Sequence, residues 1–267
     1  MAKVNRYTRI LEAIFQQYFK PGMREIRFER EELVRVAKAL RVDLPKNLGD
    51  IVYSARYRGG MPQSIAATAP EGEDWVIRPA GRSRYCFALT TQSVITPSKL
   101  LIETKIPDGT PGVIEKYAFD DEQALLAKLR YNRLIDIFTG VTCYSLQNHL
   151  RTSVSGLGQV ETDELYIGID RRGVHYVFPV QAKGRRDRIS IVQIEEDFAL
   201  CASKFPSLLC RSIGAQFVEV GLIVLFEFVE SAKGIAVAAE RHYRLVPPNE
   251  VGPDELKAYR SELLRDG

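Results

Sequence analysis

The chain has 267 residues, 45% of them hydrophobic, which is enough to form two modest hydrophobic cores. Its net charge of +3 is unevenly distributed, because residues 1–100 hold seventeen Lys and Arg against ten Asp and Glu. Such a local excess is typical of a module that binds a polyanion, and nucleic acid is the candidate partner. The longest apolar run, residues 221–226, is far shorter than the roughly 20 residues that a membrane-spanning helix needs. The four cysteines are scattered, which argues against a zinc knuckle or a disulfide framework and favours a cytoplasmic protein. From the chain length and the short apolar runs we expect a soluble protein of two domains.

The N-terminal part is predicted to contain three helices and a hairpin. Apolar residues recur at helical spacing over residues 6–19, 30–40 and 48–58, and β-rich runs at 75–78 and 84–89 flank a basic turn. Three helices followed by a basic hairpin resemble a winged helix, in which the third helix commonly enters the major groove. The alternative is a small helical domain with an ordinary charged surface. The residues that the resemblance implies as DNA contacts are Arg56, Arg58, Arg82 and Arg84.

The remainder of the chain alternates between helices and strands. Pro and Gly punctuate residues 90–118, and we place the domain boundary near residue 95, which predicts domains 1–95 and 96–267. Helical spacing predicts one helix over residues 120–139. Alternating apolar residues then predict a β-hairpin, a helix at 189–204, three further strands and a short terminal helix. Strands surrounded by helices indicate an α/β core with a mixed sheet.

The residues that could carry chemistry lie on the predicted hairpin. If its turn is centred on residue 172, residues whose numbers sum to 344 face each other. Asp163 then lies opposite Gln181, and Glu161 lies opposite Lys183. All four have odd numbers, so they share one face of the sheet. Phosphodiester cleavage needs such a cluster, because it requires a divalent cation held by oxygen ligands and a positive charge beside the phosphate.

These residues resemble a known motif. Asp163, followed eighteen residues later by Gln181-Ala182-Lys183 at the end of an apolar strand, is similar to the motif of the PD-(D/E)XK nucleases. The QxK form resembles the Mrr-like restriction endonucleases, and the resemblance covers about residues 120–230. It implies a restriction-endonuclease-like α/β core, dependence on Mg²⁺ or Mn²⁺, and cleavage of duplex DNA.

The roles expected for these residues follow from the chemistry of the motif. Asp163, the Gln181 side-chain oxygen and the Ala182 backbone carbonyl would hold the metal, and Lys183 would polarise the attacking water. Two positions depart from the commonest pattern: Thr162 replaces a proline, and Gln181 replaces an acidic residue. Because glutamine adds no negative charge, Glu161 is a further candidate ligand that would compensate for it.

Basic residues follow the motif directly. The loop after Lys183 contains the candidate phosphate contacts Arg185, Arg186 and Arg188. On the next helix, Gln193, Glu195 and Glu196 are expected on the solvent face. Glu122, on the helix before the hairpin, could supply a third carboxylate, and capping of its own helix explains it equally well.

The leading hypothesis is therefore a metal-dependent DNA endonuclease of restriction or host-defence type. A DNA-binding regulator with an inactive nuclease-like core is the first alternative, favoured by the neutral Gln181. A repair or recombination nuclease is the second, and an ordinary solvated hairpin would show the same polar residues. A double-strand cut usually requires two active sites, so we also expect a homodimer.

Overall fold

A computed structural model of the chain describes residues 6–57, 60–117, 122–231 and 234–263. The chain divides into two compact units. Unit 1 comprises Met1–Ile95, His149–Thr162 and Asp187–Pro206, and unit 2 comprises Thr96–Asn148, Asp163–Arg186 and Ser207–Gly267. Unit 1 thus contains the stretch expected as an N-terminal domain, together with two segments from later in the sequence. No helix in the described ranges is long and apolar enough to cross a membrane.

The N-terminal part of unit 1 packs helices against a small antiparallel sheet. The helices are α1 (Arg6–Tyr18), α2 (Arg30–Ala39), α3 (Gly49–Tyr57) and α4 (Gln63–Ala66), and the strand order is β1 (Glu25–Glu29), β3 (Arg84–Thr90), β2 (Asp74–Pro79). The three longer helices and the hairpin confirm the sequence prediction. Strand β1 was not predicted, because only two of its five residues are apolar. These two, Ile26 and Phe28, are buried.

An aromatic cluster organises this part of unit 1. Phe15 of α1 meets Trp75 and Phe87 edge to face, with ring centroids 5.1 and 5.3 Å apart. All three rings are buried. Aromatic pairs in this geometry stabilise a core beyond the area they bury. The cluster therefore joins the first helix to the hairpin.

Two further elements of unit 1 come from the second half of the chain. Helix α8 (Ile191–Lys204) begins at Ser190, whose hydroxyl accepts a hydrogen bond from the Val192 N–H. Strand β9 (Ile189–Ser190) pairs with β4 (Val94–Ile95). The start of α8 is thus anchored by an N-cap and by a strand pair.

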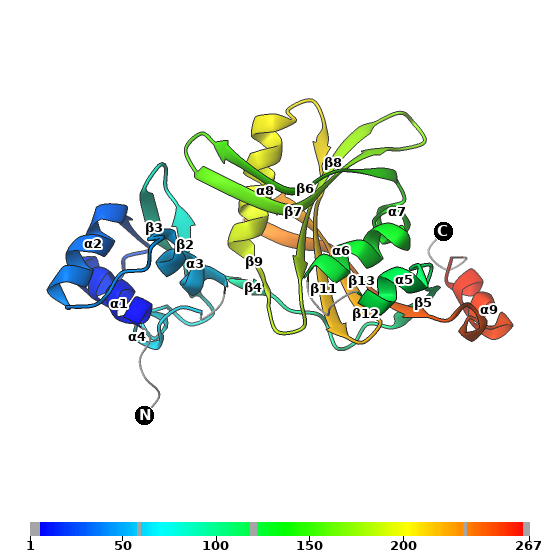
Figure 1. Cartoon of the computed structure of the whole chain (residues 1–267), viewed down its shortest axis with the longest axis horizontal. Coiled ribbons are helices and arrows are strands. Elements are labelled where there is room, and N and C mark those ends of the chain that lie inside the picture. The colour runs from blue at the N-terminus through cyan, green and yellow to red at the C-terminus, as the bar shows by residue number, and fades with distance from the viewer. Residues whose placement is uncertain (1–5, 58–59, 118–121, 232–233, 264–267) are drawn as a thin grey trace. The chain divides into compact units, whose positions relative to one another are not determined.

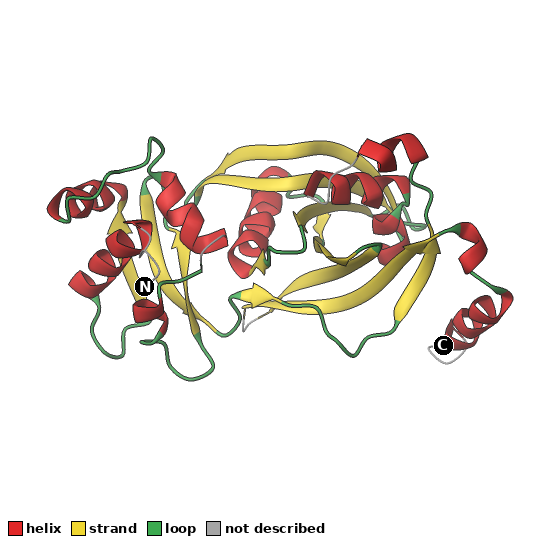
Figure 2. Cartoon of the chain, turned by 60° about the horizontal axis from the view of Figure 1, so that its bottom comes forward, coloured by secondary structure: helices red, strands yellow, loops and turns green. Residues whose placement is uncertain are grey.

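A second, mixed sheet has eight strands among the residues described. Most of it belongs to unit 2, whereas the parts of two strands within residues 149–162 belong to unit 1. The order of its strands is β5 (Glu103–Pro107), β13 (Gly234–Val246), β12 (Leu222–Ser231), β11 (Ser212–Glu219), β8 (His175–Lys183), β7 (Gly158–Ile169) and β6 (Thr142–Val154), with β10 (Leu209–Cys210) also beside β8. Strands β8 and β11 are parallel, whereas β7 and β8 are antiparallel. The predicted mixed α/β architecture is confirmed at this level. The strands, yellow in Figure 2, curl strongly.

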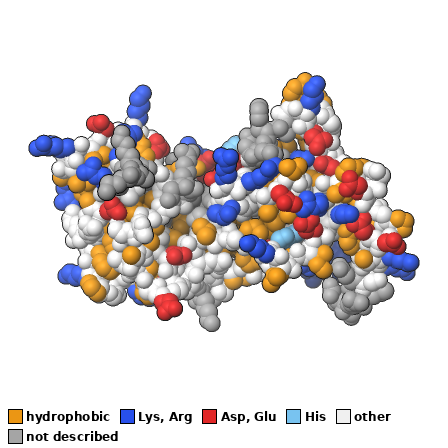
Figure 3. All heavy atoms as spheres, turned by 90° about the horizontal axis from the view of Figure 1, so that it is seen from below, with side chains coloured by type: hydrophobic (Ala, Val, Ile, Leu, Met, Phe, Trp, Pro, Cys, Tyr) orange, Lys and Arg blue, Asp and Glu red, His pale blue; other side chains and the backbone are white. Residues whose placement is uncertain are grey.

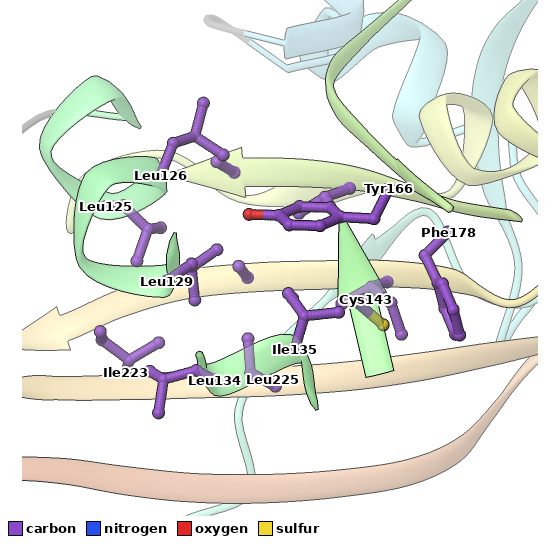
Figure 4. Close-up of a cluster of buried hydrophobic side chains, with 14 of the residues drawn as sticks. Leu125, Leu126, Leu129, Leu134, Ile135, Cys143, Tyr166, Phe178, Ile223 and Leu225 are labelled. Atoms are coloured by element: carbon purple, nitrogen blue, oxygen red, sulfur yellow. The ribbon is translucent and has the colours of Figure 1, made fainter. Parts of the chain in front are cut away.

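Helices α6 (Glu122–Tyr131) and α7 (Leu134–Thr139) lie within the curve of this sheet (Figure 1). Figure 4 shows their apolar side chains pointing toward residues of β7, β8 and β12. The fully buried members of this core include Leu125, Leu129, Phe178 and Leu225. Three short elements complete the unit: α5 (Gly112–Tyr117), a 3₁₀ turn (Pro248–Glu250) and α9 (Pro253–Leu263).

The prediction of one helix over residues 120–139 is wrong, because two helices are separated at Asn132 and Arg133. Arg133 has a left-handed backbone with φ of 50°. The buried Asn132 side chain accepts from the Gly109 N–H at 2.7 Å and donates to Thr110 Oγ1 at 3.0 Å. A distant loop thus favours the break, although the apolar spacing alone predicts a continuous helix. Residues 120 and 121 lie outside the described ranges.

Candidate functional site

The β7–β8 hairpin has the register that the sequence predicted. All six cross-strand pairs described, the last of which joins Glu164 to Val180, have residue numbers that sum to 344. Continued by one position, this register would place Asp163 beside Gln181. The register prediction is therefore confirmed up to the residue before the candidate site.

The two faces of this hairpin have different environments. The even-numbered residues Tyr166, Phe178, Val180 and Ala182 belong to the core that contains α6 and α7. Successive side chains of a strand point to opposite faces. Asp163, Gln181 and Lys183 therefore project from the other face of the sheet.

A carboxylate and an ammonium group meet where β8 ends. The Ala182 N–H donates to Asp163 Oδ2 at 2.8 Å, and Lys183 Nζ lies 3.8 Å from the same oxygen. The Asp163 side chain is 19% exposed and that of Lys183 is 12% exposed. Partial burial reduces screening by water, so this attraction is stronger than that of a surface pair. The structure thus brings together two of the three residues predicted to be catalytic.

The third predicted residue, Gln181, is fully buried on the same face. Strand β11 lies beside it, with Gly214 next to Gln181 and Gln216 next to Lys183. Gln216 is also buried, and paired positions of neighbouring strands share a face. Gln216 is therefore a polar neighbour of Lys183 that was not predicted from the sequence. It is 33 positions away along the chain, and no local pattern connects the two.

The oxygen donors at this site form a small set. Across the described ranges, no group of three or more His, Cys, Asp and Glu side chains could hold a metal ion. Asp163 offers a carboxylate and Gln181 an amide oxygen. Mg²⁺ usually keeps several waters and is held by one or two carboxylates together with substrate phosphates. Asp163 and Gln181 are thus the protein oxygen donors that such an ion could use here, and the Gln181 side chain is fully buried.

Glu161, the further candidate ligand, has a different partner. Its carboxylate lies 3.0 Å from Arg151 Nη2 of β6, and both side chains are largely exposed. The register deduced from the sequence predicted Lys183 as the neighbour of Glu161 across the hairpin. In this structure Glu161 therefore contributes to a surface ion pair of β6 and β7.

The candidate DNA contacts fall into four groups, of which Arg56 is the last. Arg82 and Arg84 are exposed at the β2–β3 turn, as a basic hairpin tip requires. Arg58 lies outside the described residues. The exposed arginines of the loop after β8 are Arg185, Arg186 and Arg188.

Arg56, by contrast, faces the interior of unit 1. Its side chain is 11% exposed, and Nη1 lies 3.4 Å from Glu196 Oε1 of α8. Its guanidinium also lies over the Tyr85 ring, 6.0 Å from the centroid. Arg78 of β2 makes a second tie to α8, with two hydrogen bonds of 2.7 Å to Glu195. In this structure Arg56 therefore holds α8 to the N-terminal helices rather than presenting a charge to solvent.

The expectation that Glu196 lies on a solvent face is wrong. Glu196 is buried, as is the neighbouring Asp197. Burial raises the pKa of Glu196 to about 7, while the positive charge of Arg56 opposes this shift. Sequence spacing did not reveal this, because the partner arginine comes from a helix 140 positions away.

Basic and acidic side chains are interspersed over the face shown in Figure 3. The candidate contacts to nucleic acid are accordingly named as individual arginines rather than as one basic patch.

Comparison with known proteins found no match among family models, curated proteins or solved structures.

Proposed function

We propose that this chain is a metal-dependent DNA endonuclease of the PD-(D/E)XK type, acting in restriction or host defence. The observation that supports this most strongly is the meeting of Asp163 and Lys183 at the end of β8, on one sheet face with Gln181. The QxK motif implies this juxtaposition. A basic loop follows the site directly, as a contact to the phosphate backbone requires.

Each residue has a role that its position permits. Asp163 and the Gln181 amide oxygen would hold Mg²⁺ or Mn²⁺, and the Ala182 N–H keeps the Asp163 carboxylate in place. The bound ion would supply the Lewis acid for phosphodiester hydrolysis. Lys183, whose ammonium group lies 3.8 Å from the Asp163 carboxylate in this structure, would offset the negative charge that develops on the phosphate.

The N-terminal part of unit 1 would grip the duplex as a winged helix. Arg82 and Arg84 lie on the hairpin tip, where they can reach phosphates. Contacts to phosphates position a protein on DNA without reading its sequence. We accordingly propose duplex DNA as the partner and a restriction-endonuclease-like fold for the core.

A cleavage assay tests the proposal. Supercoiled plasmid, with and without methylation, is incubated with the wild-type protein in Mg²⁺, in Mn²⁺ and with chelator. The variants Asp163→Asn and Lys183→Met keep the size of each side chain. Exposed residues of α9 provide matched controls that remove the same charges, namely Asp254→Asn and Lys257→Met.

We expect cleavage by the wild type and by both controls in the presence of metal, and loss of cleavage in both site variants. Circular dichroism melting shows whether the site variants remain folded. Cleavage that persists in folded Asp163→Asn and Lys183→Met proteins would show that the site is elsewhere. If the wild type leaves every substrate intact, the enzymatic proposal fails.

A second candidate function is a DNA-binding protein with an inactive nuclease-like core. It is favoured by Gln181, which is both neutral and fully buried. Fluorescence anisotropy with labelled duplex distinguishes the two. Binding without cleavage in any metal would select the inactive form.

A further inference from the structure

The two ends of the large sheet are built differently. Edge strand β5 has several of the features that keep an edge from pairing with another chain. Its Lys105 N–H donates to the Tyr259 hydroxyl of α9 at 2.9 Å, and Lys105 Nζ lies 2.6 Å from Glu255 of the same helix. Pro107 ends the strand. Charges, proline and a covering helix are the usual protections of an edge strand.

Strand β6 stands at the other end of the strand order. In the described residues its start is capped at Cys143, whose N–H donates to Asp136 Oδ1 of α7 at 3.0 Å, whereas the stretch that follows has fewer of these protections. The segment Thr142–Asn148, with sequence TCYSLQN, contains no charged residue and no proline. Its residues 144–148 are all exposed, on both faces of the strand. Tyr144 is 61% exposed and Leu146 is 55% exposed. A long, uncharged edge of this kind is a template for pairing with another strand.

The two faces of β6 differ in what they contact. Ser145 donates a hydrogen bond to the buried Glu164, and Cys143 is part of the core, so odd-numbered side chains point inward. Tyr144 and Leu146 consequently point to the opposite face. Their apolar surface remains exposed beside the free strand edge.

We propose that two copies of this chain associate through β6, which pair antiparallel about a two-fold axis. In such an arrangement each residue lies across from its own counterpart or from one of its close neighbours. A charged residue on or beside the axis would therefore lie close to the same charge of the second copy, which destabilises a cross-strand pair. The absence of charge in Thr142–Asn148 makes this segment compatible with itself.

The exposed stretch fixes the centre of the pairing. His149 is also exposed, but its φ of 47° interrupts the extended backbone. The extended, exposed residues are therefore 144–148, which have Leu146 at their midpoint, so Leu146 would lie across from Leu146 of the second copy. Main-chain hydrogen bonds form along both edges, and Tyr144 and Leu146 of both copies bury apolar surface on one side. The dimer does not depend on nuclease activity, although it would place two Asp163 sites in one particle.

Sedimentation velocity over a hundredfold range of protein concentration tests the pairing, without DNA or metal. We expect the wild type to sediment as a dimer. The variants Leu146→Lys and Leu146→Glu should each raise the dimer dissociation constant by at least about tenfold, because like charges then face each other. An equimolar mixture of the two should restore a dimer, since Lys and Glu would then pair.

The matched control is Val237→Lys on β13, an apolar residue of the same sheet that is 37% exposed and lies across from Phe228 of β12. It should leave the dimer intact, and circular dichroism reports the fold of each variant. A wild-type protein that is monomeric at every concentration would overturn the proposal, because β6 would then not pair with a second copy. A dimer that survives both Leu146 substitutions, or a mixture that fails to reassociate, would overturn it as well.

Discussion

Gly168 of the site-bearing hairpin lies in close contact with core side chains of unit 2. A Cβ added at this position would lie 2.6 Å from Phe178 Cε2 and 2.7 Å from Val141 Cγ1. Non-bonded carbons normally lie about 3.5–4.0 Å apart. Each neighbour would therefore have to move by about 1 Å. Gly168→Ala is consequently an overpacking substitution within a close-packed interior.

Two opposing effects set the magnitude. Overpacking typically costs about 1–3 kcal/mol, whereas replacing glycine stabilises by about 0.4–1 kcal/mol through the unfolded chain. Phe178 is fully buried between neighbours and has little room to retreat, so overpacking dominates. We expect the free energy of unfolding to fall by about 1–2 kcal/mol in Gly168→Ala.

Urea denaturation followed by circular dichroism measures this change. Val141→Ala removes one of the two clashing atoms, so the double variant should recover part of the loss, with a coupling of at least about 0.5 kcal/mol. The control is Gly112→Ala, where an added Cβ meets nothing within 4 Å. A Gly168→Ala protein as stable as the wild type would refute the packing described at this position. Additive effects of the two substitutions would show that Val141 is not the constraining neighbour.

Three further predictions concern charged groups. Burial raises the pKa of Glu196 from 4.5 to about 7, so the folded state binds the extra proton and stability falls as pH rises through that window. Glu196→Gln should flatten the pH dependence of the melting temperature by an amount equivalent to at most about 3 kcal/mol, and an unchanged profile would contradict the assignment. Replacing Arg82 and Arg84 with Ala should reduce the slope of log affinity for duplex DNA against log salt by up to about 2, and an equal slope would remove the hairpin tip from the interface. Lys183→Met removes the cation 3.8 Å from Asp163, so calorimetry should show Mg²⁺ binding at least as tight as in the wild type. Weaker binding in that variant would argue against Asp163 as a ligand.

Local patterns in the sequence determined several features of this protein. The spacing of Leu33, Val36 and Ala37 predicted α2, and the breaker Lys20-Pro21-Gly22 predicted the end of α1. The short turn after Ile169 predicted the register of β7 and β8. Turn and register are determined by neighbouring residues, so they can be deduced from the chain alone. The same register predicted the juxtaposition of Asp163 and Lys183.

Long-range contacts decided the rest. Strand β6 has no apolar stripe to predict it, and it is defined by its place beside β7. Asn132 divides a helix because its side chain satisfies a loop more than 20 positions earlier.

Two other outcomes also depended on partners far away in the chain. Glu196 is buried beside Arg56, which comes from a different helix. Gln216 lies next to Lys183 because β8 and β11 pair in parallel. A sequence specifies which residues prefer burial or solvent. Only the tertiary structure decides which polar groups become partners, because that depends on contacts between segments far apart in the chain.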